Sequence, residues 1–95
     1  MAIRVLIERE VDPGQEGKLQ ALLMQVRGKA INAKGYISGE TLRAANKPNK
    51  FLVISTWNSL DEWNEWQASA DRKDFQASLN KLLLTPEKTA VYDYL

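Results

Sequence analysis

Residues 50–67, KFLVISTWNSLDEWNEWQ, change abruptly from a strand pattern to a helix pattern. The first part is rich in β-branched and aromatic side chains, which is typical of a strand. Ser59 and Glu62 then form the S-x-x-E capping box that marks the first turn of a helix. The sequence therefore predicts a strand over residues 50–57 that leads directly into a helix.

Three other segments have strand character. Residues 2–10 alternate side chains in the strand period, and residues 36–45 and 88–95 are rich in residues that favour strands. Between the second and third strands, Pro48 and Asn49 in the segment NKPN predict a turn. We therefore expect these two strands to form a hairpin.

A first helix is expected between the first two strands. Asp12 is the predicted N-cap, Pro13 the first helical residue, and Gln15 the side chain that reaches back to the cap. The helix is expected to run to about Lys34, with Gly35 in the left-handed conformation that follows many helices. Its apolar positions recur at helical spacing: Leu19, Leu22, Leu23, Val26 and Ala30.

The second helix is expected to break near Ser69 and Asp71 and to end before Pro86. The resulting order is βαββαβ, with no linker or repeat, so residues 1–95 are predicted to form one domain. The fold class is α+β: a ferredoxin-like, antiparallel four-stranded sheet with two helices on one face. The apolar positions of the second helical region are Leu60, Trp63, Trp66 and Ala70, then Phe75, Leu79, Leu82 and Leu83.

The third strand has apolar side chains on both faces, because residues 51–54 are consecutive apolar residues. Two helices cover only one face of a sheet, and monomers in water rarely expose a large apolar patch. We therefore expect a homodimer in which the sheet of one copy packs on the sheet of the other.

The composition excludes several kinds of chemistry. The chain has no histidine and no cysteine, so serine–histidine pairs, cysteine nucleophiles, disulfides and imidazole or thiolate metal sites are excluded. A net charge of +1 provides no basic field for nucleic acid. No apolar run approaches a membrane span, and charges interrupt the first residues, so we expect no membrane association and a cytoplasmic protein.

The segment FLVISTWNSLDEWNEWQASADRKDFQ resembles the antibiotic biosynthesis monooxygenase family, which belongs to the dimeric α/β barrel superfamily. Members typically have a strand that ends in tryptophan, then serine and acidic residues, then aromatic residues on the helix. The matching positions here are Trp57, Ser59, Glu62, Trp63 and Trp66. The stretch KGYISGETLR is also similar to the family's second strand. The resemblance implies a pocket between the sheet and the second helix.

Some family members oxidise phenolic, quinol or anthrone-type compounds in this pocket with molecular oxygen and without a cofactor. We therefore expect a cofactor-independent monooxygenase whose partner is a small aromatic molecule, with no cofactor and no metal. Heme-degrading relatives use a tryptophan that matches Trp66 together with an axial histidine at or near Gln76. Because the chain has no histidine, heme degradation by that route is not expected.

Six residues are candidates for the site. Trp66 is predicted to line the cavity, with Trp63 and Ile7 as further substrate contacts; Ile7 lies near the position of the relatives' first-strand asparagine. The polar candidates for handling protons and charge are Tyr36, Glu8 as a base and Arg43 as an anion-holding donor.

Structural explanations compete with several of these assignments. Trp57 and Trp63 also fit roles as core anchors, Tyr36 a place at the rim or in the core, and Glu8 and Arg43 ion pairs in solvent or at the dimer interface. Glu62 is expected to serve the capping box, and Arg72 and Lys73 to lie at the surface.

Two other functions remain open. The first is a small-molecule-binding or stress-associated dimer without catalysis, and the second is a purely structural protein whose aromatic residues fill the interior.

Overall fold

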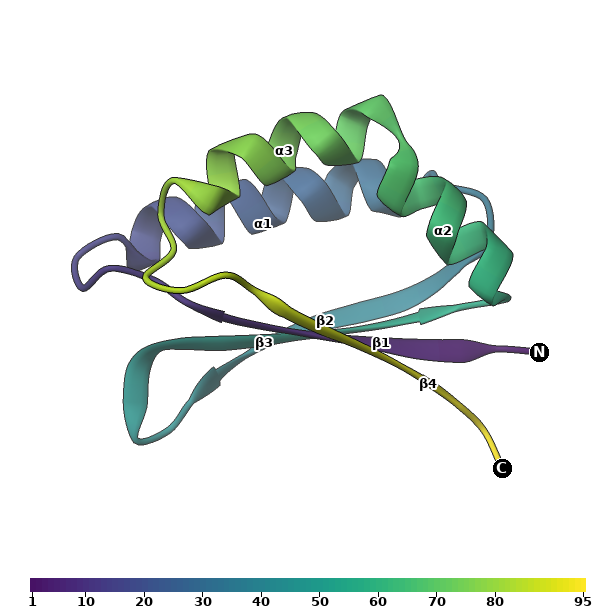
Figure 1. Cartoon of the computed structure of the whole chain (residues 1–95), viewed down its shortest axis with the longest axis horizontal. Coiled ribbons are helices and arrows are strands. Elements are labelled where there is room, and N and C mark those ends of the chain that lie inside the picture. The colour runs from purple at the N-terminus through teal and green to yellow at the C-terminus, as the bar shows by residue number, and fades with distance from the viewer.

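A computed structural model describes the whole chain, residues 1–95, as one sheet layer with helices on one face (Figure 1). The fold is the predicted α+β, ferredoxin-like fold, with the second helical region divided into two helices. The elements are β1 (Ile3–Glu10), α1 (Glu16–Ala30), β2 (Tyr36–Ala44), β3 (Lys47–Trp57), α2 (Leu60–Ala68), α3 (Ala70–Asn80) and β4 (Lys88–Asp93).

The four strands lie in the order β2-β3-β1-β4, and all neighbouring pairs are antiparallel. The two central strands pair from Ile3 opposite Trp57 to Glu10 opposite Lys50. The helices cover one face of this sheet and leave the other face uncovered in the single chain (Figure 1). We call these the inner face and the outer face. None of the helices has the length and hydrophobicity needed to span a bilayer.

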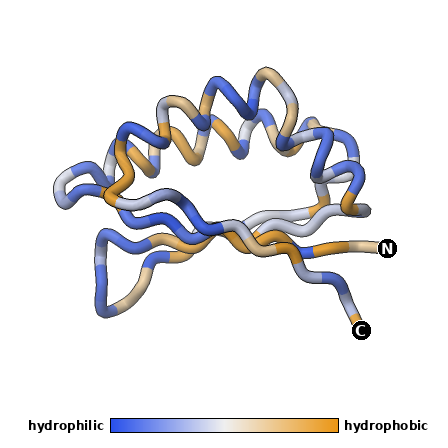
Figure 2. Tube along the Cα trace, in the orientation of Figure 1, coloured by the Kyte–Doolittle hydropathy of each residue, from blue (hydrophilic) through white to orange (hydrophobic).

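The two-residue period of β1 determines which side chains enter the core. Ile3, Val5, Ile7 and Arg9 are buried on the inner face, whereas Arg4, Glu8 and their alternating neighbours lie on the outer face. Hydrophobic residues occur in both layers (Figure 2). The core has two clusters of buried residues: Ile3, Val5, Ile7, Ala30, Trp57, Trp63 and Trp66 in one, and Val11, Leu19, Leu23, Phe51 and Leu79 in the other.

The predicted start of the first helix was wrong by several residues. α1 begins at Glu16, and its N-cap residue, Gln15, makes no side-chain cap hydrogen bond. The backbone N–H of Gln15 donates to the carbonyl of Asp12 at 2.9 Å, so Asp12 begins a turn rather than the helix. Gly14 adopts φ +94° in that turn, a conformation that favours glycine.

The predicted end of the first helix was also wrong. α1 ends at Ala30 instead of near Lys34, and its C-cap, Ile31, has right-handed helical dihedral angles. Gly35 does have the predicted left-handed conformation, with φ +86°. It reverses the chain immediately before β2 instead of terminating the helix.

The hairpin turn lies earlier than predicted, at Ala45 and Asn46, because β3 already begins at Lys47. Tertiary contacts explain the difference. The backbone N–H of Val11 donates to the carbonyl of Asn49 at 3.0 Å, and the Asn49 side chain donates to the carbonyl of Val11 at 3.0 Å. These two bonds hold the Pro48–Asn49 segment extended beside the end of β1.

Two serines cap the two helices of the second helical region. Ser59 caps α2, and its hydroxyl oxygen accepts a hydrogen bond from the backbone N–H of Glu62 at 3.2 Å. Ser69 has an extended backbone between α2 and α3, and its hydroxyl oxygen accepts from the backbone N–H of Arg72 at 3.2 Å. The predicted restart near Ser69 is therefore confirmed, because this residue ends one helix and caps the next.

Candidate functional site

Four aromatic rings meet at the end of β3. Trp57 is 1% exposed, and its ring centroid lies 5.4 Å from that of Tyr36 and 5.6 Å from that of Trp63, both in edge-on geometry. Trp66 stacks on Trp57 at 6.3 Å with an angle of 26° between the planes. The indole N–H of Trp57 donates to the Ser55 hydroxyl at 3.1 Å, so this buried polar group is satisfied. Trp57 is the core anchor that the sequence predicted.

The capping box positions the two helical tryptophans. Because Ser59 fixes the first turn of α2, Trp63 and Trp66 occupy one face of that helix, about one turn apart. Both are buried against the sheet, at 4% and 7% exposure. The Glu62 side chain also accepts a hydrogen bond from the Ser59 hydroxyl at 2.9 Å, which confirms that it serves the cap.

A small pocket of about 70 Å³ lies between the sheet and the helices, and we call it the inner pocket. Most of its wall is apolar, but two arginines, Arg9 and Arg72, also reach it. The predicted site residues that line it are Ile7, Tyr36, Trp63 and Trp66, together with the core anchor Trp57.

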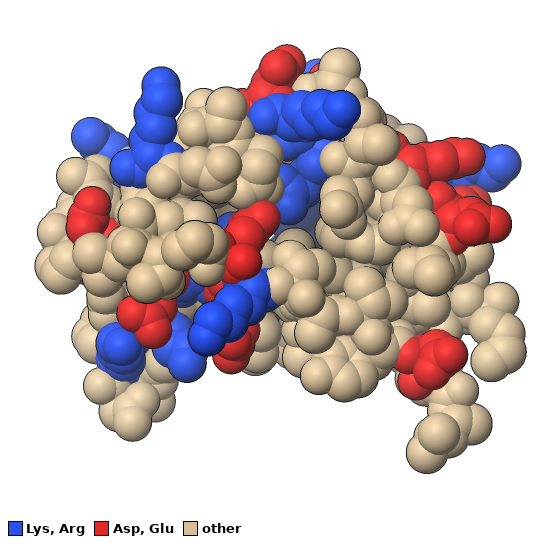
Figure 3. Space-filling model, viewed as in Figure 1, with Lys and Arg blue, Asp and Glu red and all other residues tan.

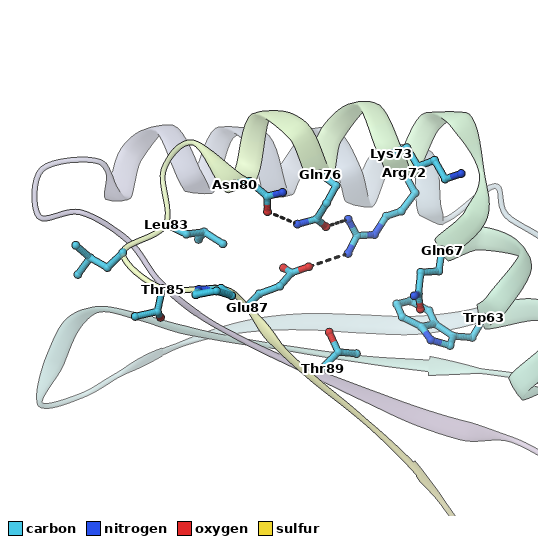
Figure 4. A pocket seen from close by; sticks show the side chains of 12 residues that line it. Trp63, Gln67, Arg72, Lys73, Gln76, Asn80, Leu83, Thr85, Glu87 and Thr89 are labelled. Carbon is cyan, nitrogen blue, oxygen red and sulfur yellow. Dashed lines mark hydrogen bonds and ion pairs between the residues drawn. The ribbon is translucent and has the colours of Figure 1, made fainter.

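A larger hollow of about 640 Å³, the outer groove, lies between α3 and the segment that leads into β4 (Figure 4). The space-filling view shows a hollow on this side of the molecule with basic and acidic side chains around it (Figure 3). Most of the residues that line the outer groove are polar, and they include Gln67, Lys73 and Glu87. Trp63 and Arg72 line both hollows, so these two side chains separate the inner pocket from the outer groove.

One carboxylate holds both arginines at this boundary. The Nε of Arg9 donates to Glu87 Oε2 at 2.6 Å, and a terminal nitrogen of Arg72 lies 3.7 Å from Glu87 Oε1. Arg72 also donates to the side chain of Gln76, which in turn donates to Asn80 at 2.7 Å (Figure 4). The two arginine side chains are 3% and 7% exposed, and Glu87 is 17% exposed.

Burial is the main influence on these cations. Desolvation lowers the pKa of Arg9 below its usual value, while the charge of Glu87 and its hydrogen bond act in the opposite direction. Burial also lowers the pKa of Arg72; Glu87 opposes that shift, and the nearby positive charge of Arg9 adds to it. At both arginines, the loss of water around the cation therefore outweighs the stabilisation that Glu87 provides.

The structure corrects the expectation that Arg72 lies at the surface. α3 begins immediately after Ser69, which places Arg72 in the first turn and directs it toward Glu87 (Figure 4). Lys73, its neighbour in sequence, is exposed as predicted. Sequence reasoning did not identify Arg9 at all, although a signal was present: the alternation of Ile3, Val5 and Ile7 continues to position 9.

Two predicted polar candidates do not reach the inner pocket. Glu8 lies on the outer face, where its side chain is 48% exposed and its carboxylate is 4.0 Å from the Lys50 ammonium group. Arg43 lies on the inner face of the edge strand β2, opposite Phe51, but it lines a separate hollow beside Met24. The alternation of β1 explains the placement of Glu8. Arg43 faces α1 near the other end of β2 from Tyr36, so it lines a different hollow from the aromatic residues.

The polar side chains offer no arrangement typical of a metal centre. No group of three or more acidic, histidine or cysteine side chains is placed to hold a metal ion. The only acidic side chain that lines the outer groove is Glu87, and it is engaged by the two arginines.

The antiparallel sheet, the βαββαβ order and the aromatic pocket between the layers define a ferredoxin-like α+β protein. The chain belongs to the antibiotic biosynthesis monooxygenase family, because the family model with the description "Antibiotic biosynthesis monooxygenase" matches residues 2–78. No protein with a curated description matches the sequence.

Solved structures share the fold at low sequence identity. SnoaB, a cofactor-independent oxygenase from Streptomyces nogalater, has a TM-score of 0.90 at 14% identity and covers 99% of this chain and 93% of its own. Rv0793 from Mycobacterium tuberculosis has a TM-score of 0.91 at 19% identity, and the match covers 100% of this chain and 96% of that protein. A conserved protein from Methanosarcina mazei Go1 has a TM-score of 0.92 at 17% identity, and the match covers 97% of this chain and 91% of that protein.

Proposed function

We propose that this protein is a cofactor-independent monooxygenase that oxidises a small phenolic, quinol or anthrone-type compound with dioxygen. The observation that carries the proposal is the wall of four packed aromatic rings around a pocket in a member of this family: Tyr36, Trp57, Trp63 and Trp66. Apolar, aromatic walls suit a planar aromatic ligand. The description of the structural neighbour SnoaB as a cofactor-independent oxygenase supports the same function.

The chemistry needs a reactive substrate more than a reactive protein. An anthrone-type substrate loses a proton, and the resulting anion gives one electron to dioxygen. The two radicals combine into a carbon-bound peroxide, which takes up a proton and loses water to leave a carbonyl group. One oxygen atom enters the product, the other leaves as water, and the substrate carbon supplies both hydrogen atoms. The protein contributes orientation, exclusion of water and stabilisation of the anion.

Within the inner pocket, Trp66, Trp63 and Ile7 would hold the ring of the substrate. Tyr36 is partly buried at the same wall, and its hydroxyl provides a hydrogen-bond donor and acceptor for the reacting oxygen. Glu8 and Arg43 are not part of this assignment, because neither lines the pocket.

Trp63 would have to move when substrate enters. The inner pocket of about 70 Å³ is smaller than typical ligand sites of roughly 300–1,000 Å³, whereas the outer groove of about 640 Å³ falls within that range. Because Trp63 lines both hollows, rotation of its indole would join them into one cavity with an aromatic end and a polar end.

The proposed active form is a homodimer that buries the outer face of the sheet. Cross-strand partners share a face, so Leu6, Leu52 and Ile54 of the central strands lie together there, beside Leu42 and Tyr92 of the edge strands. Leu42 and Tyr92 are 47% and 56% exposed in the single chain. A second sheet packed on this face would cover the patch.

A non-catalytic binding protein is the second candidate. The observation that favours it is the position of Glu8: the predicted base lies on the opposite face of the sheet from the aromatic pocket. Such a protein would bind the same aromatic compounds without consuming dioxygen.

Isotope labelling separates the two functions. The purified protein would be incubated with an anthrone under dioxygen labelled with a heavy oxygen isotope, and the product would be analysed by mass spectrometry. A monooxygenase produces a protein-dependent product that contains one labelled oxygen atom. Binding without protein-dependent incorporation of label would instead establish the binding protein.

A further inference from the structure

The cluster of Arg9, Arg72 and Glu87 has more positive charge than its partners neutralise. Two arginines share one carboxylate, and Glu87 is the only acidic side chain that lines the outer groove. The inner pocket, which both arginines line, adds one charge of each sign, Arg27 and Glu40. Lys73 lines the same groove and adds a further positive charge at its rim. A buried charge without full compensation is costly, so the cluster favours an additional anion.

The hydrogen bonds of the two guanidinium groups are also incomplete. Arg9 makes one hydrogen bond within the chain, from Nε to Glu87, although its side chain is only 3% exposed. Arg72 uses one terminal nitrogen for Gln76 and has the other 3.7 Å from Glu87. A guanidinium group has several N–H donors in a planar fork. Gln15 Oε1 is the only fully buried side-chain nitrogen or oxygen atom without a partner, so the unused nitrogens of both arginines keep some exposed surface. Both side chains line the inner pocket, where further donors can meet a ligand.

An aromatic surface lies beside these donors. Trp63 and Arg72 line both the inner pocket and the outer groove, so an indole and a guanidinium group border the same passage. A ligand placed across this boundary meets an apolar wall on one side and a cationic fork on the other. The planar carboxylate is the group whose geometry matches such a fork.

We infer that the ligand of this pocket is an aromatic carboxylate whose ring packs on Trp63 and whose carboxylate is bound by Arg72 and Arg9. One excess positive charge in the three-residue cluster matches a monoanion, and Glu87 opposes a second negative charge on the ligand. The inference deepens the proposed function by naming the substrate class, and it rests on that function only for the position of the ring.

A purely structural role for the cluster makes a different prediction. In a structural role, the 2.6 Å ion pair between Arg9 and Glu87 would by itself fix the segment before β4 against β1. In that case Arg72 would add stability through its contacts with Glu87 and Gln76 and would have no effect on ligand choice. The two roles therefore differ in whether Arg72 distinguishes a charged ligand from a neutral one.

The test compares naphthoate with naphthamide, a neutral amide of nearly the same shape. Affinity for the full-length protein would be measured by equilibrium dialysis and by quenching of tryptophan fluorescence. The variants are Arg72→Gln, Arg72→Lys and, as a control that removes one positive charge from an exposed position on α1, Lys18→Gln. Circular dichroism would establish that each variant is folded.

The wild-type protein and Lys18→Gln are expected to bind naphthoate about tenfold more tightly than naphthamide, as a charge-assisted bidentate contact predicts. Arg72→Gln should lose this preference while it keeps its affinity for naphthamide, and Arg72→Lys should restore part of it. Equal affinity of the wild-type protein for the two ligands, or no binding of either, would overturn the inference. So would a preference that persists in folded Arg72→Gln. Dioxygen consumption plays no part in this measurement, so its outcome is independent of whether the protein is an oxygenase.

Discussion

The indole of Trp66 stacks on that of Trp57, with ring centroids 6.3 Å apart and planes inclined by 26°. Trp57 ends a central strand, and Trp66 belongs to the helix that follows, so this stacked pair joins the two layers of the fold. The pair also forms part of the wall of the inner pocket. The same contact therefore serves both stability and the proposed site, and substitutions at its two members should separate these contributions.

Replacement of Trp57 by Phe should mainly lower stability. The smaller ring leaves a cavity at a position that is 1% exposed, and the hydrogen bond to Ser55 is lost. We expect the free energy of unfolding to fall by about 1–3 kcal/mol. Trp66→Phe should lose less, because Trp66 also borders a hollow at the surface. Urea denaturation of both variants measures the difference, and a larger loss in Trp66→Phe would contradict this account.

Gly35 should not tolerate a side chain. Its φ is +86°, and an added Cβ would lie 2.5 Å from the Glu62 carboxyl carbon. Gly35→Ala is expected to cost roughly 1–3 kcal/mol of stability through backbone strain and displacement of Glu62 from its cap. Gly28→Ala is the matched control: Gly28 lies in α1 with open space around its Cα, so the change should stabilise by about 0.5–1 kcal/mol. Thermal unfolding that ranks the two variants in the opposite order would refute the prediction.

Gly39 controls the position of the Tyr36 hydroxyl. A Cβ at residue 39 would lie 2.6 Å from the Tyr36 oxygen, so Gly39→Ala should push the phenol ring out of place. We expect ligand affinity or turnover to fall to a level close to that of Tyr36→Phe, while the protein stays folded. Measurement of both variants with the same aromatic ligand checks this. Full activity in Gly39→Ala combined with a loss in Tyr36→Phe would show that the hydroxyl acts from another position.

Ser69 should be important for the junction between α2 and α3. Its hydroxyl accepts from the Arg72 backbone N–H at 3.2 Å and donates to the carbonyl of Trp66 at 2.7 Å. Ser69→Ala should therefore cost about 1 kcal/mol in chemical denaturation, the usual cost of losing an N-cap. Ser78→Ala, at an exposed position within α3, is the control and should have little effect. A similar loss in both variants would exclude a special role for the cap.

A charge on the outer face should dissociate the proposed dimer. Ile54 lies in the centre of that face, opposite Leu6 of β1, so Ile54→Glu would bury a carboxylate between the two sheets. Size-exclusion chromatography with light scattering should show a dimer for the wild-type protein and a monomer for Ile54→Glu. Gln25→Glu adds the same charge at an exposed position on α1 and should remain dimeric. A monomeric wild-type protein would remove the basis for the dimer.

Local signals were sufficient to predict most of the fold. The capping box at Ser59 and the restart at Ser69 depend on hydrogen bonds within a few residues, and both were predicted correctly. The turn at Pro48 was placed wrongly because the contacts of Asn49 with Val11 join residues that are distant in sequence. A single sequence does not show such contacts, and they can override a local preference for a turn.

The candidate site was only partly predictable for the same reason. The tryptophans are close together in sequence and on one helix face, so their proximity could be predicted from spacing alone. Arg9, Arg72 and Glu87 come from β1, α3 and the segment before β4, and only the folded chain brings them together. Charged residues are usually exposed, so a prediction from residue type alone places them at the surface.

Oxygen uptake tests the central claim most directly. The purified protein would be mixed with a panel of anthrones and hydroquinones in the presence of metal chelators, with Trp66→Phe measured in parallel and Lys18→Gln, at an exposed position on α1, as a control outside both hollows. The account predicts protein-dependent uptake that falls in Trp66→Phe and is unchanged in Lys18→Gln. Uptake that is no faster than the uncatalysed reaction with every compound, or equal in wild type and Trp66→Phe, would contradict it.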